Sequence, residues 1–63
     1  MNEAMRQARI NKNMSQADFA RKIGVSRQTI NMIENESYNP TIELCTRICR
    51  ELNVTLNDLF WKE

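Results

Sequence analysis

Side chains suited to hydrogen bonding with a ligand lie close together near the middle of the chain. Arg27 comes first and carries a guanidinium. It is followed by four side chains at the spacing i, i+3, i+4 and i+7, which are Gln28, Asn31, Met32 and Asn35. On a helix this spacing places them on one face. Arginine and amide side chains carry the donors and acceptors that match base edges in the major groove of DNA. The pattern therefore predicts a helix face that contacts DNA bases.

The chain lacks the residues that catalysis and metal binding usually need. The 63 residues include no histidine, no glycine-rich phosphate loop and no acidic pair expected to share a pocket, so an enzyme is not expected. Cys45 and Cys49 share one helix face, but a metal site needs further ligands that the chain does not offer. We therefore expect no metal and no cofactor, and half-buried packing for both thiols rather than a disulfide.

The charge is small overall but unevenly distributed. The net charge is +1, yet residues 1–27 hold six basic and two acidic side chains, whereas residues 28–63 hold three basic and six acidic ones. A net +4 at one end suits an anionic polymer. An accident of a short sequence explains the asymmetry equally well, so charge alone does not decide the partner.

The length and hydropathy bound the class of protein. A chain of this size is expected to form a single domain, residues 1–63, and to bury only about 60% of its unfolded surface, so dimerisation would help to stabilise it. No apolar run approaches the roughly 18 residues of a membrane span. The residues after Met1 do not resemble a signal peptide. We expect no membrane partner and a cytoplasmic location.

Capping residues divide the chain into five predicted helices. These cover residues 3–12, 16–23, about 27–35, 42–52 and a short segment that begins at residue 56. The expected N-caps are Ser15, Ser26, Thr41 and Thr55. The residues suited to end helices in the left-handed conformation are Asn13, Gly24 and Asn53. No segment alternates like a strand, so the predicted fold is all-α.

The second and third predicted helices are joined by only three residues, Gly24-Val25-Ser26. So short a turn makes the helices cross steeply, as in a helix-turn-helix. Gly24 can take the positive φ of a sharp exit, and Ala20 is small where the helices would approach closely. The small core expected to hold their angle contains Phe19, Ile23, Ile30 and Ile33.

The segment SQADFARKIGVSRQTINMIEN, followed by YNP and later by VTLNDLF, resembles the Cro/CI-type helix-turn-helix family, also called lambda-repressor-like or XRE. The resemblance runs from Met5 to Phe60 and is greatest to very short stand-alone bacterial and phage repressors. It implies a compact five-helix DNA-binding domain. It also implies a transcriptional repressor that binds a two-fold symmetric operator in double-stranded DNA as a homodimer. No small-molecule effector is expected.

The resemblance assigns contacts residue by residue. Bases would be contacted by Arg27, Gln28, Asn31 and Met32, of which Met32 departs from the polar residue that is usual there. Phosphates would be contacted by Gln16, Thr29, Asn35, Tyr38 and Asn39. Gln16 would also brace Arg27, while Tyr38 could equally pack flat on the protein.

One further pair of positions and one single position carry expectations from the resemblance. Arg9 and Glu34 match positions that form a partly buried structural ion pair. Glu36 stands where the family commonly has glycine, and a glutamate there is disfavoured at positive φ and repels phosphate.

The dimer interface is expected at the C-terminal end. Leu56, Phe60 and Trp61 provide more apolar surface than one short helix needs, whereas Leu59 should be core. Trp61 could anchor this interface, or it could instead cover the core of its own chain. Two other functions also remain open: an antitoxin with a toxin partner, and a protein-interaction module, in which the third helix should present an apolar face.

Overall fold

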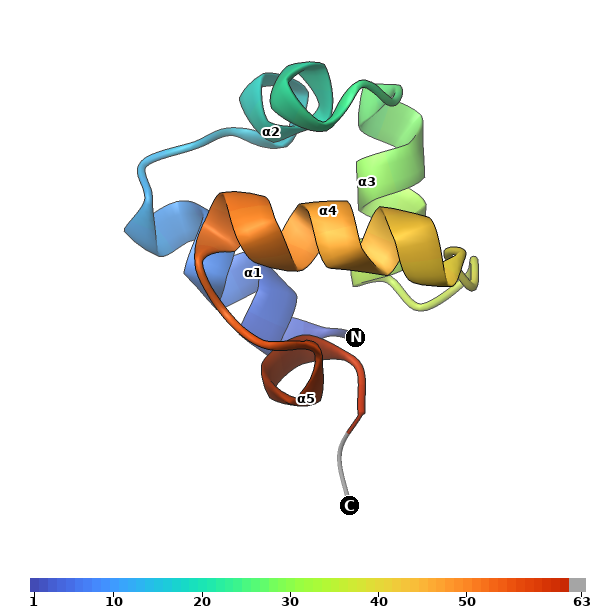
Figure 1. Cartoon of the computed structure of the whole chain (residues 1–63). Coiled ribbons are helices and arrows are strands. Elements are labelled where there is room, and N and C mark those ends of the chain that lie inside the picture. The colour runs from blue at the N-terminus through green and yellow to red at the C-terminus, as the bar shows by residue number, and fades with distance from the viewer. Residues whose placement is uncertain (62–63) are drawn as a thin grey trace.

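Side-chain caps begin all five helices of the computed structural model, which describes residues 1–61 (Figure 1). The helices are α1 (Glu3–Asn11), α2 (Gln16–Ile23), α3 (Arg27–Glu34), α4 (Ile42–Leu52) and α5 (Leu56–Leu59). In each, a cap side chain accepts a hydrogen bond from a backbone amide three residues later; the caps are Asn2, Ser15, Ser26, Thr41 and Thr55. Four of the five were predicted, and Asn2 was missed although it directly precedes the helix. The all-α fold is confirmed.

The helices end where the sequence predicted, to within one residue. Gly24 and Asn53 close α2 and α4 in the left-handed conformation, at φ 89° and 58°, and Asn13 follows α1 at φ 60°. The first and third helices are each one residue shorter than predicted, because Lys12 and Asn35 are C-caps rather than helical residues. Local cap chemistry therefore determines the helix boundaries.

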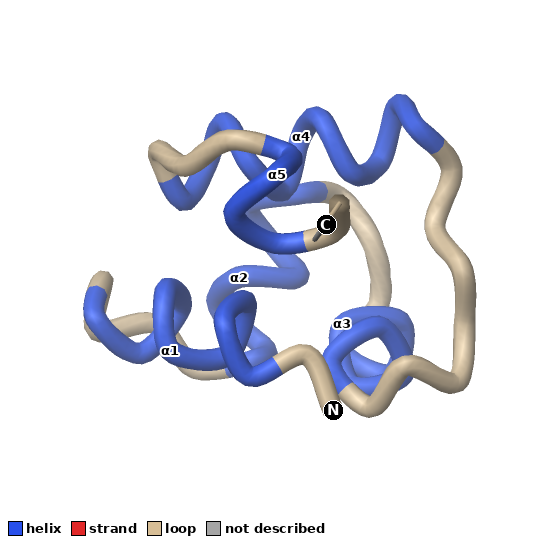
Figure 2. Tube along the Cα trace, turned by 90° about the horizontal axis from the view of Figure 1, so that it is seen from below, coloured by secondary structure: helices blue, strands red, loops and turns tan. Residues whose placement is uncertain are grey.

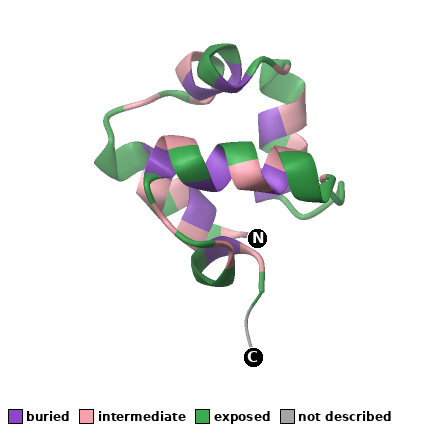
Figure 3. Cartoon of the chain, viewed as in Figure 1, coloured by how far each residue is buried: buried purple, intermediate pink, exposed green. Residues whose placement is uncertain are grey.

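The helices surround one core. Figure 1 shows α4 crossing the middle of the view, with α2 and α5 at opposite ends and α3 turned steeply away from α2. Seen from below in Figure 2, α4 lies on one side of the molecule and α1 and α3 lie on the other. The buried hydrophobic residues come from every helix, as the purple segments in Figure 3 show. They are Met5, Phe19, Ala20, Ile23, Ile30, Ile33, Cys45, Ile48, Cys49, Leu52 and Leu59. The small core predicted between the second and third helices is therefore continuous with the core under α4.

The two cysteines are buried more deeply than the sequence predicted. Cys45 is 6% exposed and Cys49 is 4% exposed, so both thiols are core groups rather than half-buried ones. The reason is that α4 lies over the centre of the molecule and buries the face that carries Cys45, Ile48, Cys49 and Leu52. Burial raises the pKa of both thiols, which keeps them protonated near neutral pH.

The part of the chain that the structure describes contains neither a membrane-spanning helix nor a cluster of metal ligands. Among residues 1–61, no helix has the length and hydropathy needed to cross a bilayer. In the same residues, no three cysteine or acidic side chains gather as a metal site would require.

Glu36 adopts the backbone conformation that favours glycine. Its φ is 60°, just after the end of α3. We expect the Glu36→Gly variant to have a free energy of unfolding about 1 kcal/mol above that of Glu36→Ala, because only glycine relieves the left-handed strain while both variants lose the carboxylate. Urea denaturation of the two variants measures the difference. Equal stabilities would show that the position carries no strain.

Asp58 makes the stability of the fold depend on pH. The Thr55 amide donates to Asp58 Oδ2 at 2.9 Å, and this bond and one with the Thr55 hydroxyl hold the pKa of Asp58 below its ordinary value of 3.8. The folded chain then binds fewer protons than the unfolded chain near that pH. The stabilisation is therefore complete above pH 3.8 and is lost as the pH falls through the lowered pKa.

We therefore expect the free energy of unfolding of Asp58→Asn to fall less than that of the parent chain when the pH is lowered from about 6 to about 3. Urea denaturation at several pH values measures the slope for the variant and for the parent chain. Identical slopes would exclude the capping carboxylate as a source of the pH dependence.

Candidate nucleic-acid interface

The turn between α2 and α3 sets the direction of the helix that carries the candidate base contacts. The amides of Gly24 and Val25 both donate to the Ala20 carbonyl, at 2.8 and 3.0 Å, which closes the end of α2. From α4, Arg47 Nη1 donates to the Ile23 carbonyl at 3.0 Å and ties the turn to the rest of the fold. This last contact was not predicted, since nothing local in the sequence connects Arg47 to the turn.

The outward face of α3 carries the predicted polar stripe. Arg27, Gln28, Asn31 and Asn35 are exposed, while Met32 is half-buried. On the opposite face, Ile30 and Ile33 are 0% and 2% exposed. Four of the residues singled out from the sequence therefore lie together on α3 and Asn35 caps its end, while the opposite face of the helix packs on the core.

The guanidinium of Arg27, in the first turn of α3, is available to contact a ligand. Within residues 1–61, Arg27 makes no ion pair, unlike Arg6, Arg9, Arg21 and Arg47. Ser26 caps the helix through the amide of Thr29, and the hydroxyl oxygens of these two residues are 2.9 Å apart. An unpaired arginine at a helix N-terminus adds its charge to the partial positive charge of the helix end, which favours an anionic ligand.

Behind this face, Glu34 joins three helices. Arg9 Nε lies 2.8 Å from Glu34 Oε2, and both side chains are almost completely buried. Arg9 Nη1 also donates to the Met14 carbonyl at 2.7 Å. From α2, Gln16 Nε2 donates to Glu34 Oε1 at 3.2 Å. The ion pair thus connects α1 to α3, and Gln16 adds α2.

The partner of Gln16 differs from the expected one. The resemblance implied a brace from Gln16 to Arg27, whereas the structure shows Gln16 Nε2 bonded to Glu34 Oε1 and to Asn31 Oδ1, the latter at 3.4 Å. The buried carboxylate of Glu34 is a stronger acceptor than any group that Arg27 offers, because a guanidinium only donates. Gln16 is therefore tied to the middle of α3 and not to its first turn.

The loop after α3 turns back toward the N-terminus. The Met1 ammonium lies 2.6 Å from Glu36 Oε2 and offsets the negative charge of this carboxylate, which by itself repels phosphate. Tyr38 is 41% exposed and Asn39 is exposed. Tyr38 is thus neither buried flat nor fully in solvent.

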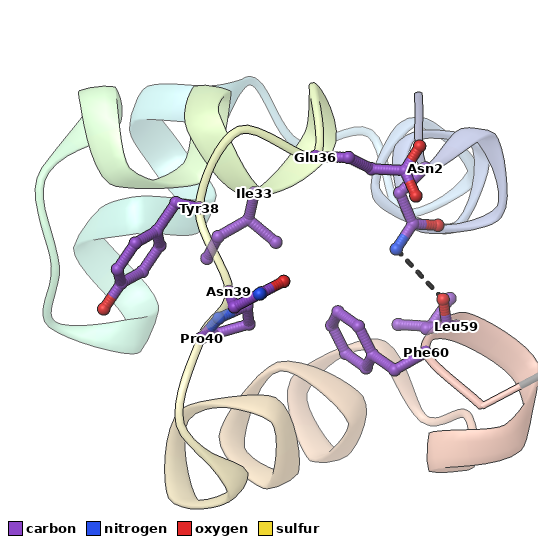
Figure 4. A pocket seen from close by; sticks show the side chains of 8 residues that line it. All are labelled: Asn2, Ile33, Glu36, Tyr38, Asn39, Pro40, Leu59 and Phe60. Atoms are coloured by element: carbon purple, nitrogen blue, oxygen red, sulfur yellow. Dashed lines mark hydrogen bonds between the residues drawn. The ribbon is translucent and has the colours of Figure 1, made fainter.

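A shallow cavity of about 140 Å³ separates this loop from α5. Figure 4 shows the loop residues Tyr38, Asn39 and Pro40 on one side and Leu59 and Phe60 on the other, with Ile33 on α3 closing the back. Asn2 Nδ2 donates to the Leu59 carbonyl at 3.0 Å and closes the cavity at the N-terminal segment.

The C-terminal apolar residues divide into two groups. Leu56 and Phe60 are half-buried and pack against the core, whereas Trp61 is 52% exposed. Leu59 is in the core, as predicted. Of the three residues expected at a dimer interface, Trp61 thus offers the most free surface.

Comparison with known proteins identifies the family. A family model described as helix-turn-helix matches residues 5–59, which is most of the chain. The chain belongs to the Cro/CI-type (XRE) helix-turn-helix family of transcriptional regulators. The match includes all five helices except the first residues of α1.

Several relatives support this membership. An uncharacterized HTH-type transcriptional regulator of Archaeoglobus fulgidus is 38% identical over 60 residues, covering 95% of this chain and 86% of the relative. Another from Methanocaldococcus jannaschii is 44% identical over 48 residues, covering 76% and 73%. The uncharacterized HTH-type transcriptional regulator YgzD of Bacillus subtilis is 32% identical and covers 100% and 96%.

A solved structure shares the fold. The hypothetical transcription factor NHTF from Neisseria superposes with a TM-score of 0.79 at 28% identity. The match covers 86% of this chain, which spans 61% of the length of that one. This helix-turn-helix protein is therefore a DNA-binding regulator of transcription and not an enzyme, as the sequence predicted.

Proposed function

We propose that this helix-turn-helix regulator is a repressor that binds a two-fold symmetric operator as a homodimer. The observation that carries the proposal is the outward stripe of α3, in which Arg27, Gln28 and Asn31 are exposed above buried isoleucines. Arginine and amides recognise base edges in the major groove. A face of this polarity does not suit a protein-interaction module, which would present apolar side chains there.

The phosphate contacts are proposed to surround this stripe. Gln16 and Thr29 lie at or near the N-termini of α2 and α3, where free backbone amides favour anions. Asn35, Tyr38 and Asn39 extend the same set past the end of α3. Such contacts would position the protein on DNA, while Arg27, Gln28, Asn31 and Met32 would select the sequence.

The dimensions of the chain support a dimer. The described residues measure 30 × 22 × 20 Å, whereas two half-sites of an operator are about 34 Å apart. One copy therefore covers one half-site. We propose that Leu56, Phe60 and Trp61 meet their counterparts across a two-fold axis, with repression by occupation of a promoter and a cytoplasmic location.

Selection of bound sites from random DNA duplexes tests the proposal. We expect a consensus in which a short half-site is repeated with two-fold symmetry. Affinity should also fall steeply as salt rises, because bound phosphates release counterions. Selection without a repeated consensus would contradict binding of a dimer to an operator. Binding to a protein partner with an affinity that does not change with salt concentration would instead favour an interaction module or an antitoxin.

The dimer interface has its own test. Trp61→Lys should weaken self-association by about tenfold or more, because it places a charge where an apolar anchor is proposed. Sedimentation equilibrium measures the monomer–dimer constant, and circular dichroism checks that the variant stays folded. Ile42→Lys is the matched control, since Ile42 is 60% exposed but lies on α4. Equal effects of the two variants would exclude Trp61 as the anchor.

A further inference from the structure

A series of hydrogen bonds orients the amide of Asn31 on the outward face of α3. It begins at Glu34, which is 2% exposed and whose ionised carboxylate, paired with Arg9, can only accept. Gln16 must therefore turn its nitrogen toward Glu34, and the same Nε2 also donates to Asn31 Oδ1. The orientation of one exposed amide is thus set by a buried charge.

A second donor acts on the same oxygen. Asn35 Nδ2 lies 3.4 Å from Asn31 Oδ1, which leaves that oxygen accepting from two side chains. A carbonyl oxygen has two lone pairs, so its accepting capacity is used. In the described part of the chain, no side chain or carbonyl accepts from the Asn31 NH2 group. Asn31 therefore presents two N–H donors outward and no acceptor.

We propose that Asn31 is a specificity-determining residue that reads guanine, an inference that rests on the proposed binding of DNA through α3. Guanine displays two acceptors, N7 and O6, side by side in the major groove, whereas adenine displays an acceptor beside an NH2 donor. The usual pairing of asparagine with adenine needs a free side-chain oxygen, which Asn31 lacks. Cytosine displays a donor, and thymine displays a single acceptor beside its methyl group.

Gln16 has a positioning role in this scheme. If Gln16 has no NH2 group, the Asn31 amide loses the donor that is anchored on Glu34. The Asn31 amide can then rotate and accept a hydrogen bond from adenine. The distinguishing readout is the ratio of affinities for guanine and adenine at one operator position. Loss of a phosphate contact by Gln16 would lower both affinities and leave that ratio unchanged.

The test begins with the operator selected by the parent chain. Asn31→Ala identifies the half-site position whose base preference depends on this side chain, and guanine is the expected base there. The parent chain should prefer guanine over adenine by about tenfold and should lose a similar factor with 7-deazaguanine, which lacks the N7 acceptor. Gln16→Met should reduce the guanine preference to about twofold. Asn39→Ala is the control, because a loop residue that contacts phosphate should leave the ratio unchanged.

A second variant keeps the test independent of Gln16. Asn31→Asp replaces the outward NH2 group with an acceptor, so the preferred base should change from guanine to cytosine. Adenine, thymine or cytosine as the parent base at this position would overturn the inference. So would an unchanged ratio in Gln16→Met, or no change of base preference in Asn31→Ala. If the parent chain selects no DNA sequence at all, the proposed function itself fails.

Discussion

Replacing Arg9 with methionine should remove most of the free energy of unfolding of this small domain at room temperature. Glu34 would remain 2% exposed with only Gln16 as a side-chain donor, and the Met14 carbonyl would lose its bond to Arg9. Removing one partner of a buried ion pair costs about 3–5 kcal/mol. A domain of this size has a free energy of unfolding on the order of 5 kcal/mol, so the loss consumes most of it.

The matched control removes both charges. In Arg9→Met combined with Glu34→Met, no unpaired charge is buried, and much of the stability should return because apolar replacements of buried ion pairs are often well tolerated. Urea denaturation of the parent chain, the two single variants and the double variant completes a thermodynamic cycle. A cost below about 1 kcal/mol for Arg9→Met would show that the ion pair contributes little.

Replacing Arg27 with alanine should abolish most of the preference for the operator while leaving the fold intact. Arg27 is exposed and forms no ion pair within residues 1–61, so its removal leaves no buried charge unpaired. One good base contact contributes about 1–3 kcal/mol of discrimination, and a dimer makes the contact in both half-sites. We therefore expect a loss of roughly 2–6 kcal/mol on the full operator and a relaxed base preference at one position of each half-site.

Arg50→Ala separates this effect from a loss of charge alone. Arg50 is also exposed and lies on α4, away from the proposed reading face. Its removal should change binding to operator and to random duplex by similar, small factors. Titration of both duplexes with each variant gives the comparison. If Arg27→Ala weakens the two duplexes equally, Arg27 contacts phosphate and not a base.

The glutamate at the end of α3 has consequences for both stability and binding. At φ 60°, Glu36 adopts the conformation that glycine takes at low cost, yet its carboxylate pairs with the Met1 ammonium. A glutamate at this position repels phosphate. The ion pair with Met1 offsets its charge, which favours the proposed contacts of Tyr38 and Asn39 with phosphate.

The five helices and the face that each of them buries could be predicted from local patterns along the chain. Serine and threonine caps, left-handed asparagines and Gly24 act within one helical turn of their own positions, so their effects can be predicted locally. Apolar spacing likewise predicts that Ile30 and Ile33 lie behind the polar stripe, and both are buried.

Contacts between side chains on different helices could not be predicted from the sequence, because they follow from how the helices pack. The bonds from Gln16 to Glu34 and Asn31 depend on the angle between α2 and α3. The Arg47 contact with the α2–α3 turn and the depth of the two thiols depend on how α4 packs on these helices. Side-chain hydrogen bonds have a range of about 3 Å, so a small rotation between helices exchanges one partner for another. Helix spacing along the chain does not specify such rotations; the packing of the shared core does.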